Sequence, residues 1–216
     1  MTTHLLNPGD FAAVIDLETG GFSRVEHALI EVAVLLVDHN WEPVDHYQTY
    51  VHPEPGKIVE DSAAGVNGYT PESWGYFGDG TDPSDEQLAA VVSPLVTLAE
   101  CRQQLSDWVA NRGRWHGIAF NKGFDKSWTV EFLPELAAAL HLEWRDPKTA
   151  YQRWKKEQLG VKKLEKGMTK LAAVCSDLQY EAVTGERWVR HTALDDCYAA
   201  RFVASHMDVR GFLHNA

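Results

Sequence analysis

The first 52 residues contain three apolar, β-prone runs that follow one another with short connections. Residues 11–17, 28–37 and 47–52 each have the composition of a strand, and residues 38–40 supply the turn between the second and the third. Because strands joined by tight turns pair in opposite directions, the three runs predict an antiparallel meander.

After Pro53 the pattern changes to loops and capped helices. An N-cap followed by proline at residues 70–72 and 146–147, and a capping box at residues 84–87, indicate helix starts. The expected elements are helices from residue 70 and over 84–111, 126–141, 147–159, 168–176 and 193–208, and short strands over 116–120 and 142–145. This order predicts an α/β or α+β sheet flanked by helices.

A chain of 216 residues has the size of one domain. No linker-like stretch divides it, so residues 1–216 are expected to form a single domain, with residues 75–86 as an acidic surface excursion. The most apolar run, residues 28–37, is too short to span a bilayer, and the first residues do not have the pattern of a targeting signal. A soluble, cytoplasmic protein is therefore expected.

The cysteines Cys101, Cys175 and Cys197 are odd in number and widely separated. Without a Cys-x-x-Cys pair they indicate neither a disulfide framework nor a zinc site, and we expect buried free thiols. The function therefore has to rest on other side chains.

The net charge of −11 is unevenly distributed along the chain. Residues 1–100 carry 2 basic and 17 acidic side chains, whereas residues 145–190 carry 11 basic and 6 acidic ones. The basic segment fits either contact with a phosphate backbone or a solvated helix face. Its basic side chains include Lys148, Arg153, Lys155, Lys156, Lys162, Lys163, Lys166, Lys170, Arg187 and Arg190.

Two carboxylates, Asp16 and Glu18, stand at the end of the first expected strand. Side chains alternate across a strand, so these two share a face. They repel each other there, and a bound cation is one direct way to relieve that cost. The structural alternative is an ordinary polar strand end followed by a turn at Thr19, Gly20 and Gly21.

Asp125 and Asp196 are further candidates, each near an expected helix start. Asp125 fits an N-cap, a metal ligand or both. At the second start, Thr192 and Asp195 fit a capping arrangement, which leaves Asp196, on a different helix face, able to reach a metal. His191 fits either a structural histidine or a general base that acts near pH 7.

Three motifs in this order resemble those of the DEDDh 3′–5′ exonucleases, the group that contains ribonuclease T and the proofreading subunit of bacterial DNA polymerase III. The histidine five residues before the last aspartate is typical of this branch, because the DEDDy branch has a tyrosine at the position of Thr192. Oligoribonuclease-type members have Glu-Met-Thr-Gly in the first motif, which differs from this chain. The motifs are Asp16-x-Glu18-Thr-Gly, Asn121-x-x-Phe124-Asp125 and His191-x-Ala193-x-x-Asp196.

The resemblance implies an α/β, RNase H-like fold with a mixed five-stranded sheet flanked by helices. It also implies two Mg²⁺ or Mn²⁺ ions about 3.5–4 Å apart, one bound by Asp16, Glu18 and Asp196 and the other mainly by Asp16, with Asp125 acting directly or through water. His191 would deprotonate the water at the first ion. The implied reaction is hydrolysis of phosphodiester bonds at the 3′ end of single-stranded DNA or RNA, with release of nucleoside 5′-monophosphates.

Several residues near these motifs are candidates for contact with the substrate. A glycine lets the backbone approach a nucleotide closely, an asparagine braces the loop that carries it, and an aromatic ring stacks a base at about 1–3 kcal/mol. Core packing is the alternative for each ring. The candidates are Thr19, Gly20, Asn121, Trp74 and Phe77.

The same sequence also fits other functions. A proofreading or accessory module would dock a polymerase or another nucleic-acid enzyme, although mutually repelling carboxylates serve no docking purpose. An RNase H-type endonuclease would share the acidic cluster but gives His191 no reason to precede Asp196 by five residues. Some members of the group that the motifs resemble dimerise and present a basic patch to the partner's site, so a homodimer is a further alternative.

Overall fold

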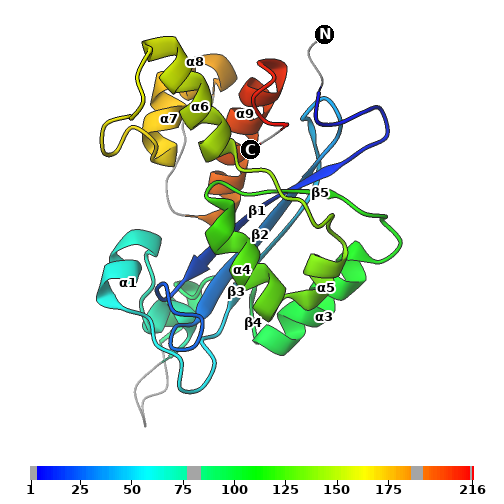
Figure 1. The fold of residues 1–216 in the computed structure, drawn as a ribbon. Helices are drawn as coiled ribbons and strands as arrows, with labels where there is room; N and C mark the ends of the chain where they lie inside the picture. Colours follow the sequence, from blue (N-terminus) through cyan, green and yellow to red (C-terminus); the bar gives the residue numbers. More distant parts are fainter. Residues whose placement is uncertain (1–3, 77–83, 186–191, 215) are drawn as a thin grey trace.

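A five-stranded sheet forms the centre of the computed structural model, which describes residues 4–76, 84–185, 192–214 and 216 (Figure 1). The strand order is β4-β3-β2-β1-β5. The central pairs β1–β2 and β2–β3 are antiparallel, and the outer strands β5 and β4 pair in parallel with β1 and β3. The mixed five-stranded sheet is therefore confirmed. The strands are β1 (Ala12–Thr19), β2 (Leu29–Val37), β3 (Pro43–Val51), β4 (Leu95–Val96) and β5 (His116–Ile118).

Helices cover the sheet in two groups, as Figure 1 shows. The first group, α3 to α5, consists of α3 (Leu98–Val109), α4 (Lys122–Phe132) and α5 (Pro134–Ala138). The second group, α6 to α9, consists of α6 (Pro147–Leu159), α7 (Leu171–Asp177), α8 (Tyr180–Thr184) and α9 (Ala193–Val209). Three short helices, α1 (Asp61–Asn67), the 3₁₀ helix η1 (Glu72–Trp74) and α2 (Asp85–Ala89), lie between β3 and β4 in the chain.

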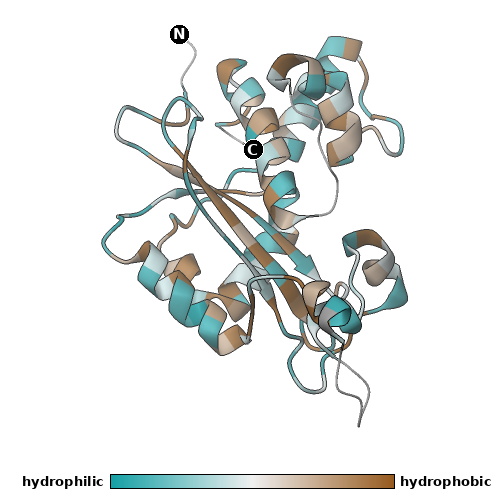
Figure 2. Ribbon diagram, turned by 180° about the vertical axis from the view of Figure 1, so that it is seen from behind, coloured by the Kyte–Doolittle hydropathy of each residue, from teal (hydrophilic) through white to brown (hydrophobic). Residues whose placement is uncertain are grey.

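Alternation along β1 divides its side chains between two apolar cores. Ala12 and Val14 belong to the core shared with α6 to α9, whereas Ala13, Ile15 and Leu17 belong to the core shared with α3 to α5. Figure 2 shows the apolar colouring along the central strands, between helices that carry polar residues outward. Because side chains alternate, the positions after Val14 on the first face point toward α9.

The expected helix over residues 84–111 is wrong. The capping box at Ser84 is present, but α2 ends at Ala89. Pro94 has no backbone N–H with which to continue a helix, and the chain instead forms β4, an edge strand that was not expected. A second capping box, Thr97 with Glu100, then starts α3.

Three smaller expectations are corrected as well. The helix expected over residues 126–141 is divided by Pro134 into α4 and α5, and the strand expected over residues 142–145 is reduced to an isolated bridge from Arg145 to Ile118. The proline at residue 71 starts only a 3₁₀ turn, and α8 was not expected at all. Helices α6 and α9 lie where the caps predict them.

The three cysteines are buried and free, as expected. Within the described ranges, no helix has both the length and the apolar composition needed to cross a membrane.

Candidate metal centre and active site

Three carboxylates from opposite ends of the chain meet at the end of β1. Asp16, Glu18 and Asp196 each place one carboxylate oxygen so that all three lie within 4.8 Å of one another. The alternation of β1 aims the first two side chains at α9, and the first turn of α9 carries the third. The structure thus brings together residues that are 180 positions apart in the sequence.

The first turn of α9 is held by a cap. The Thr192 hydroxyl accepts a hydrogen bond from the Asp195 backbone N–H at 3.2 Å and donates to the Asp195 carboxylate at 2.7 Å. Asp195 is therefore occupied by the cap, as the sequence predicts, whereas Asp196 faces the end of β1. The cap fixes the direction of the ligand that comes from α9.

Asp125 approaches the same cluster from α4. Its side chain is buried, and its carboxylate accepts hydrogen bonds from its own backbone N–H and from that of Leu17 on β1. The alternative role as an N-cap is wrong, because Asn121 occupies the N-cap position and Asp125 lies inside the first turn. Asp125 stands beside the three-carboxylate group, close enough for its charge to raise the pKa of Asp16.

The carboxylates of this cluster resist ionisation. Burial is the largest cause of the pKa of Asp16 lying well above its usual value, followed by the negative charges of Asp125 and Asp196. Burial raises the pKa of Glu18 to about 8, with further contributions from Asp196 and Glu31. A divalent cation bound among these oxygens favours their ionised forms, so the donor set fits a hard metal ion such as Mg²⁺.

A fifth carboxylate, Glu31 on β2, was not anticipated. It pairs directly with Glu18 across the β1–β2 ladder and is buried. It accepts a hydrogen bond from the Gln48 side-chain amide at 2.8 Å and another from the backbone N–H of Ala193, the first residue of α9. Glu31 therefore links β2 to the helix that carries Asp196. The one signal in the sequence is that Glu31 is the single charged residue in the apolar run 28–37.

A hollow of about 330 Å³ opens beside Glu18. Its walls include Thr19, Phe22, Val66, Asn67 and Phe124. The Phe22 side chain is 88% exposed and meets the Phe124 ring edge-on, with 6.1 Å between the ring centroids. An exposed ring next to a carboxylate cluster suits the stacking of a planar group. Phe22 lies two residues after the first motif, although nothing in the sequence marks it as exposed.

The turn after β1 is packed against the chain itself. A Cβ atom on Gly20 would lie 2.2 Å from the carbonyl oxygen of Ile58, so the packing of the chain on itself requires a glycine here, and the expected contact of Gly20 with a nucleotide stays a prediction. Thr19 donates from its hydroxyl to the carbonyl of Gly21 at 2.8 Å and lines the hollow. Thr19 thus stands next to the expected substrate site.

The remaining candidate residues have different outcomes. Trp74 is 3% exposed, donates its indole N–H to the Ile30 carbonyl and packs in a small core, so the structure favours core packing over base stacking. Asn121 adopts a left-handed conformation at the start of α4, and its side-chain oxygen accepts a hydrogen bond from the Lys148 ammonium at 3.3 Å. Phe77 and His191 lie outside the described residues.

The arrangement of the sheet and of the acidic cluster defines a class: the chain has the RNase H-like fold of DEDDh nuclease domains. The nuclease domain of 3′hExo, a DEDDh family member solved with bound rAMP, is 20% identical with a TM-score of 0.61 over 95% of this chain and 96% of that domain. Exonuclease I of E. coli, solved with a dT13 oligonucleotide, is 15% identical with a TM-score of 0.66 over 93% of this chain and 41% of the exonuclease. The expected fold is therefore confirmed.

In sequence, the chain is similar to ribonuclease T of Pectobacterium atrosepticum, with 31% identity over 125 residues. The aligned part is 55% of this chain and 50% of that protein, so the chain spans about half the length of this curated relative. No protein-family model matches the chain. The resemblance to DEDDh exonucleases that the motifs predict is confirmed by these similarities.

We expect the metal-free protein to lose stability as the pH rises. Because the fold favours the protonated carboxylates, their contribution to the free energy of unfolding is complete below the usual carboxylate pKa. This contribution is lost as the pH rises through the raised pKa values, about 8 for Glu18. Asp16→Asn removes one of the repelling charges and should raise the Tm of the metal-free protein at pH 8.5 by on the order of 5 °C. Thermal unfolding in EDTA, with Glu54→Gln as an exposed control, measures this. A wild-type Tm that does not fall between pH 6 and pH 8.5 contradicts it.

Glu31 gives a second prediction. Glu31→Ala leaves the backbone N–H of Ala193 and the amide of Gln48 without their acceptor, which should lower the free energy of unfolding by about 1–3 kcal/mol. The shifted first turn of α9 should also weaken Mg²⁺ binding about tenfold. Glu31→Gln keeps one acceptor oxygen and should retain most of the stability and most of the Mg²⁺ affinity. Chemical unfolding and calorimetric titration with Mg²⁺ test the two variants. An unchanged Mg²⁺ affinity in Glu31→Ala argues against the role of Glu31 in positioning α9.

Proposed function

We propose that the chain is a metal-dependent 3′–5′ exonuclease, a hydrolase that cleaves phosphodiester bonds at the 3′ end of single-stranded DNA or RNA and releases nucleoside 5′-monophosphates. The observation that carries the proposal is the convergence of Asp16, Glu18 and Asp196, with Asp125 beside them, next to an open hollow. We propose residues 1–216 as one exonuclease domain.

The cofactor is two Mg²⁺ or Mn²⁺ ions. Carboxylate oxygens are the ligands that these hard cations prefer, and the cluster is otherwise burdened by its own repulsion. When bound, such ions neutralise the charge that develops on the phosphate and lower the pKa of water. Asp16, Glu18 and Asp196 would hold the first ion, and Asp16 would be the main ligand of the second, with Asp125 acting directly or through water.

The terminal nucleoside occupies the hollow beside Glu18. A volume of about 330 Å³ suits one nucleoside, and the exposed Phe22 ring offers a surface on which its base stacks. Asn67 donates from its side chain to the carbonyl of Thr19 at 3.1 Å, which ties α1 to the end of β1 across this hollow.

His191 is the general base in this proposal. Its place five residues before Asp196 matches the third motif, and an imidazole takes a proton from the attacking water near neutral pH. Exonuclease I was solved with a single-stranded oligodeoxynucleotide and 3′hExo with a ribonucleotide, which supports a strand end of either sugar as the substrate class. Association with a polymerase, or with a second copy of the chain, stays a prediction.

Digestion of end-labelled oligonucleotides tests the proposal directly. With Mg²⁺, a 5′-labelled single strand should give a ladder that shortens from the 3′ end, whereas a 3′-labelled strand should release labelled mononucleotide at once. EDTA and Asp196→Asn should each stop digestion, because both remove metal binding. A circular single strand should stay intact. Cleavage of the circle, or digestion that continues in EDTA, contradicts the proposal, and matched RNA and DNA strands identify the preferred sugar.

The role of His191 has a separate test. His191→Ala should lower kcat by 10²–10⁴-fold, the usual contribution of general base catalysis, while Mg²⁺ binding is retained. A pH–rate profile should lose its acidic limb in the variant, since the imidazole no longer titrates. A kcat within threefold of wild type rules out this role.

A further inference from the structure

A hollow of about 820 Å³, the lysine hollow, lies between α6 and the segment that follows it. It is distinct from the hollow beside Glu18, and none of its lining residues belongs to the three motifs. Its side chains are cationic or polar apart from one leucine and one carboxylate. The lining includes Gln152, Lys156, Lys163, Glu165, Lys166 and Thr169.

The lysines of this hollow are not neutralised locally. Residues 145–170 contain nine basic and three acidic side chains. Lys155, on the neighbouring face of α6, is paired with Asp177 at 2.6 Å. By contrast, within the described ranges no carboxylate oxygen lies within 4 Å of the ammonium groups of Lys156, Lys163 or Lys166. Three cations gathered around one concave surface repel each other unless an anion lies between them.

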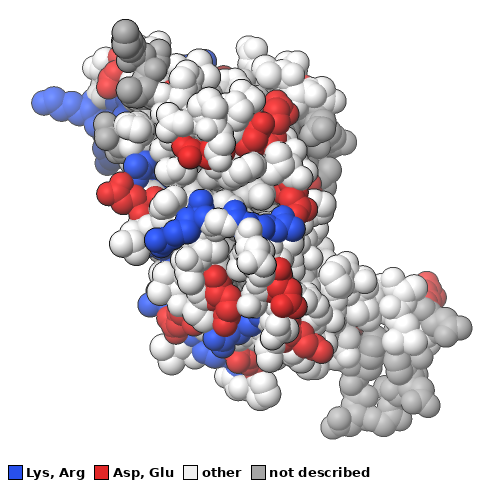
Figure 3. All heavy atoms as spheres, turned by 90° about the vertical axis from the view of Figure 1, so that its right-hand side faces the viewer, with Lys and Arg blue, Asp and Glu red and all other residues white. Residues whose placement is uncertain are grey.

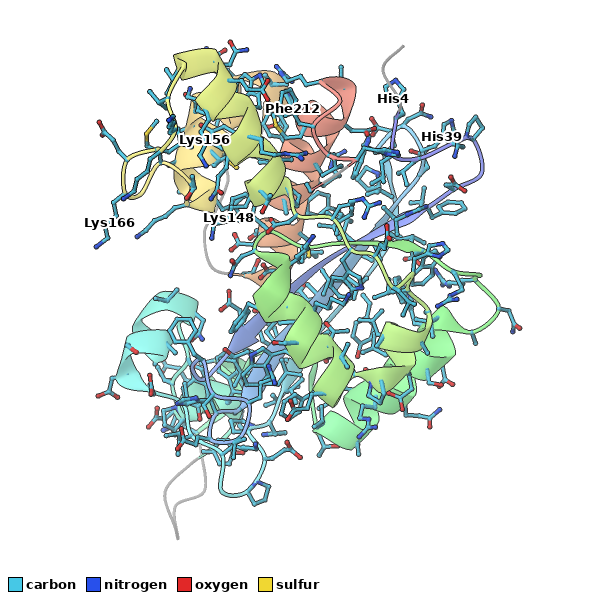
Figure 4. The ribbon with its side chains drawn as sticks, viewed as in Figure 1. His4, His39, Lys148, Lys156, Lys166 and Phe212 are labelled. Carbon is cyan, nitrogen blue, oxygen red and sulfur yellow. The ribbon has the colours of Figure 1, made fainter. Side chains whose placement is uncertain are left out.

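Helix α6 and its Lys148 connect the lysine hollow to the start of α4, the helix that carries Asp125. Lys148, in the first turn of α6, donates to the Asn121 side chain there. Lys156 is eight residues further along α6, which corresponds to about 12 Å. Figure 4 shows Lys148 close to the start of α4, Lys156 further along α6 and Lys166 on the outer loop, all on one side of the molecule.

Helix α6 carries Lys148 and Lys156 on a well-supported backbone, whereas Lys163 and Lys166 lie in the segment that follows it. The Asp146 carboxylate caps it by accepting from the backbone N–H groups of Lys148 and Thr149, and Gly160 ends it in a left-handed conformation. Tyr151 is buried in the core and donates to Asp177 at 2.9 Å. The cations of α6 are thus held in place before any ligand arrives, which reduces the entropic cost of binding.

Other surfaces of the molecule carry both signs of charge. Figure 3 shows the right-hand side of Figure 1, where basic and acidic side chains lie interspersed. Among the described residues, Arg102 of α3 pairs with Glu135 of α5, and Arg112, just after α3, pairs with Asp45 of β3. With a net charge of −11, the chain as a whole repels a polyanion, so a local basic surface is needed to guide one.

We propose that the lysine hollow binds the phosphates of the substrate strand upstream of its 3′ end, with Lys148 lying between this subsite and the catalytic centre. The inference rests on the proposed function, because it assumes that the strand ends at the metal centre. The lysine hollow would then recognise the length of the strand and not the identity of its bases. Phosphate contacts of this kind position a strand and carry no sequence information.

The test compares two double variants with the same loss of charge. Lys163→Gln with Lys166→Gln removes two cations from the lysine hollow, and Arg102→Gln with Arg112→Gln removes two from a distant surface. Binding of a fluorescent single strand of about 15 nucleotides is measured by anisotropy in EDTA. The first variant should bind about tenfold more weakly than the second, and its slope of log Kd against log salt should be smaller by about 1.4, or 0.7 for each lost contact.

Kinetics with two substrates separates the inference from the proposed function. The p-nitrophenyl ester of thymidine 5′-monophosphate has no upstream phosphates, so its hydrolysis should be equal in both variants and the wild type. With the long strand, the lysine variant should have a KM about tenfold higher and an unchanged kcat. Lys163→Arg with Lys166→Arg should restore the wild-type KM, because both cations are kept. Equal Kd and KM in the two glutamine variants overturns the lysine hollow as a subsite. Absence of hydrolysis in the wild type counts against the proposed function, while the anisotropy still decides the inference.

Discussion

Repulsion among half-buried and buried carboxylates at the end of β1 is the constraint on which the rest of this structure depends. Hydrogen bonds from backbone and amide groups offset part of the cost of ionising Asp125 and Glu31. At Glu18, burial and neighbouring charge both raise the pKa. A fold that holds these groups together in spite of the cost needs rigid supports on several sides, and the central strand, the cap of α9 and the first turn of α4 provide them. A divalent cation is the compensation that this donor set fits.

Local rules predicted the supports of this cluster correctly. The alternation of β1 put Asp16 and Glu18 on one face, and the cap at Thr192 separated Asp195 from Asp196. Both depend on neighbours within three residues, which the sequence contains in full. The proline at the start of α6 is of the same kind. The order of the motifs then placed these elements in a known fold.

Other features depend on contacts between distant segments, which no local pattern contains. The strand Leu95–Val96 exists because it pairs with the end of β3, and Trp74 is buried because β2 and β3 lie beneath it. Gly20 packs against Ile58, 38 residues away, which no pattern around Gly20 indicates. Glu31 becomes part of the site only when β2 is paired with β1 in the observed register. Sequence periodicity gives the face of a side chain and leaves the identity of its neighbour undetermined.

The uneven distribution of charge along the chain fits two demands of the proposed function, the binding of cations and the attraction of a polyanion. Cation binding requires carboxylates, and β1 near the amino terminus supplies two of the proposed ligands, Asp16 and Glu18. Attraction of a polyanion requires the opposite sign, and a surface that mixed both signs would cancel its own field within a Debye length. Residues 145–170 hold nine of the 20 basic side chains of the chain, and α6 with the segment that follows it carries eight of these nine, including Lys148 beside the start of α4. Under the proposed function, the basic segment would hold a strand by its phosphates, and the end of that strand would meet the carboxylates that β1, α4 and α9 bring together.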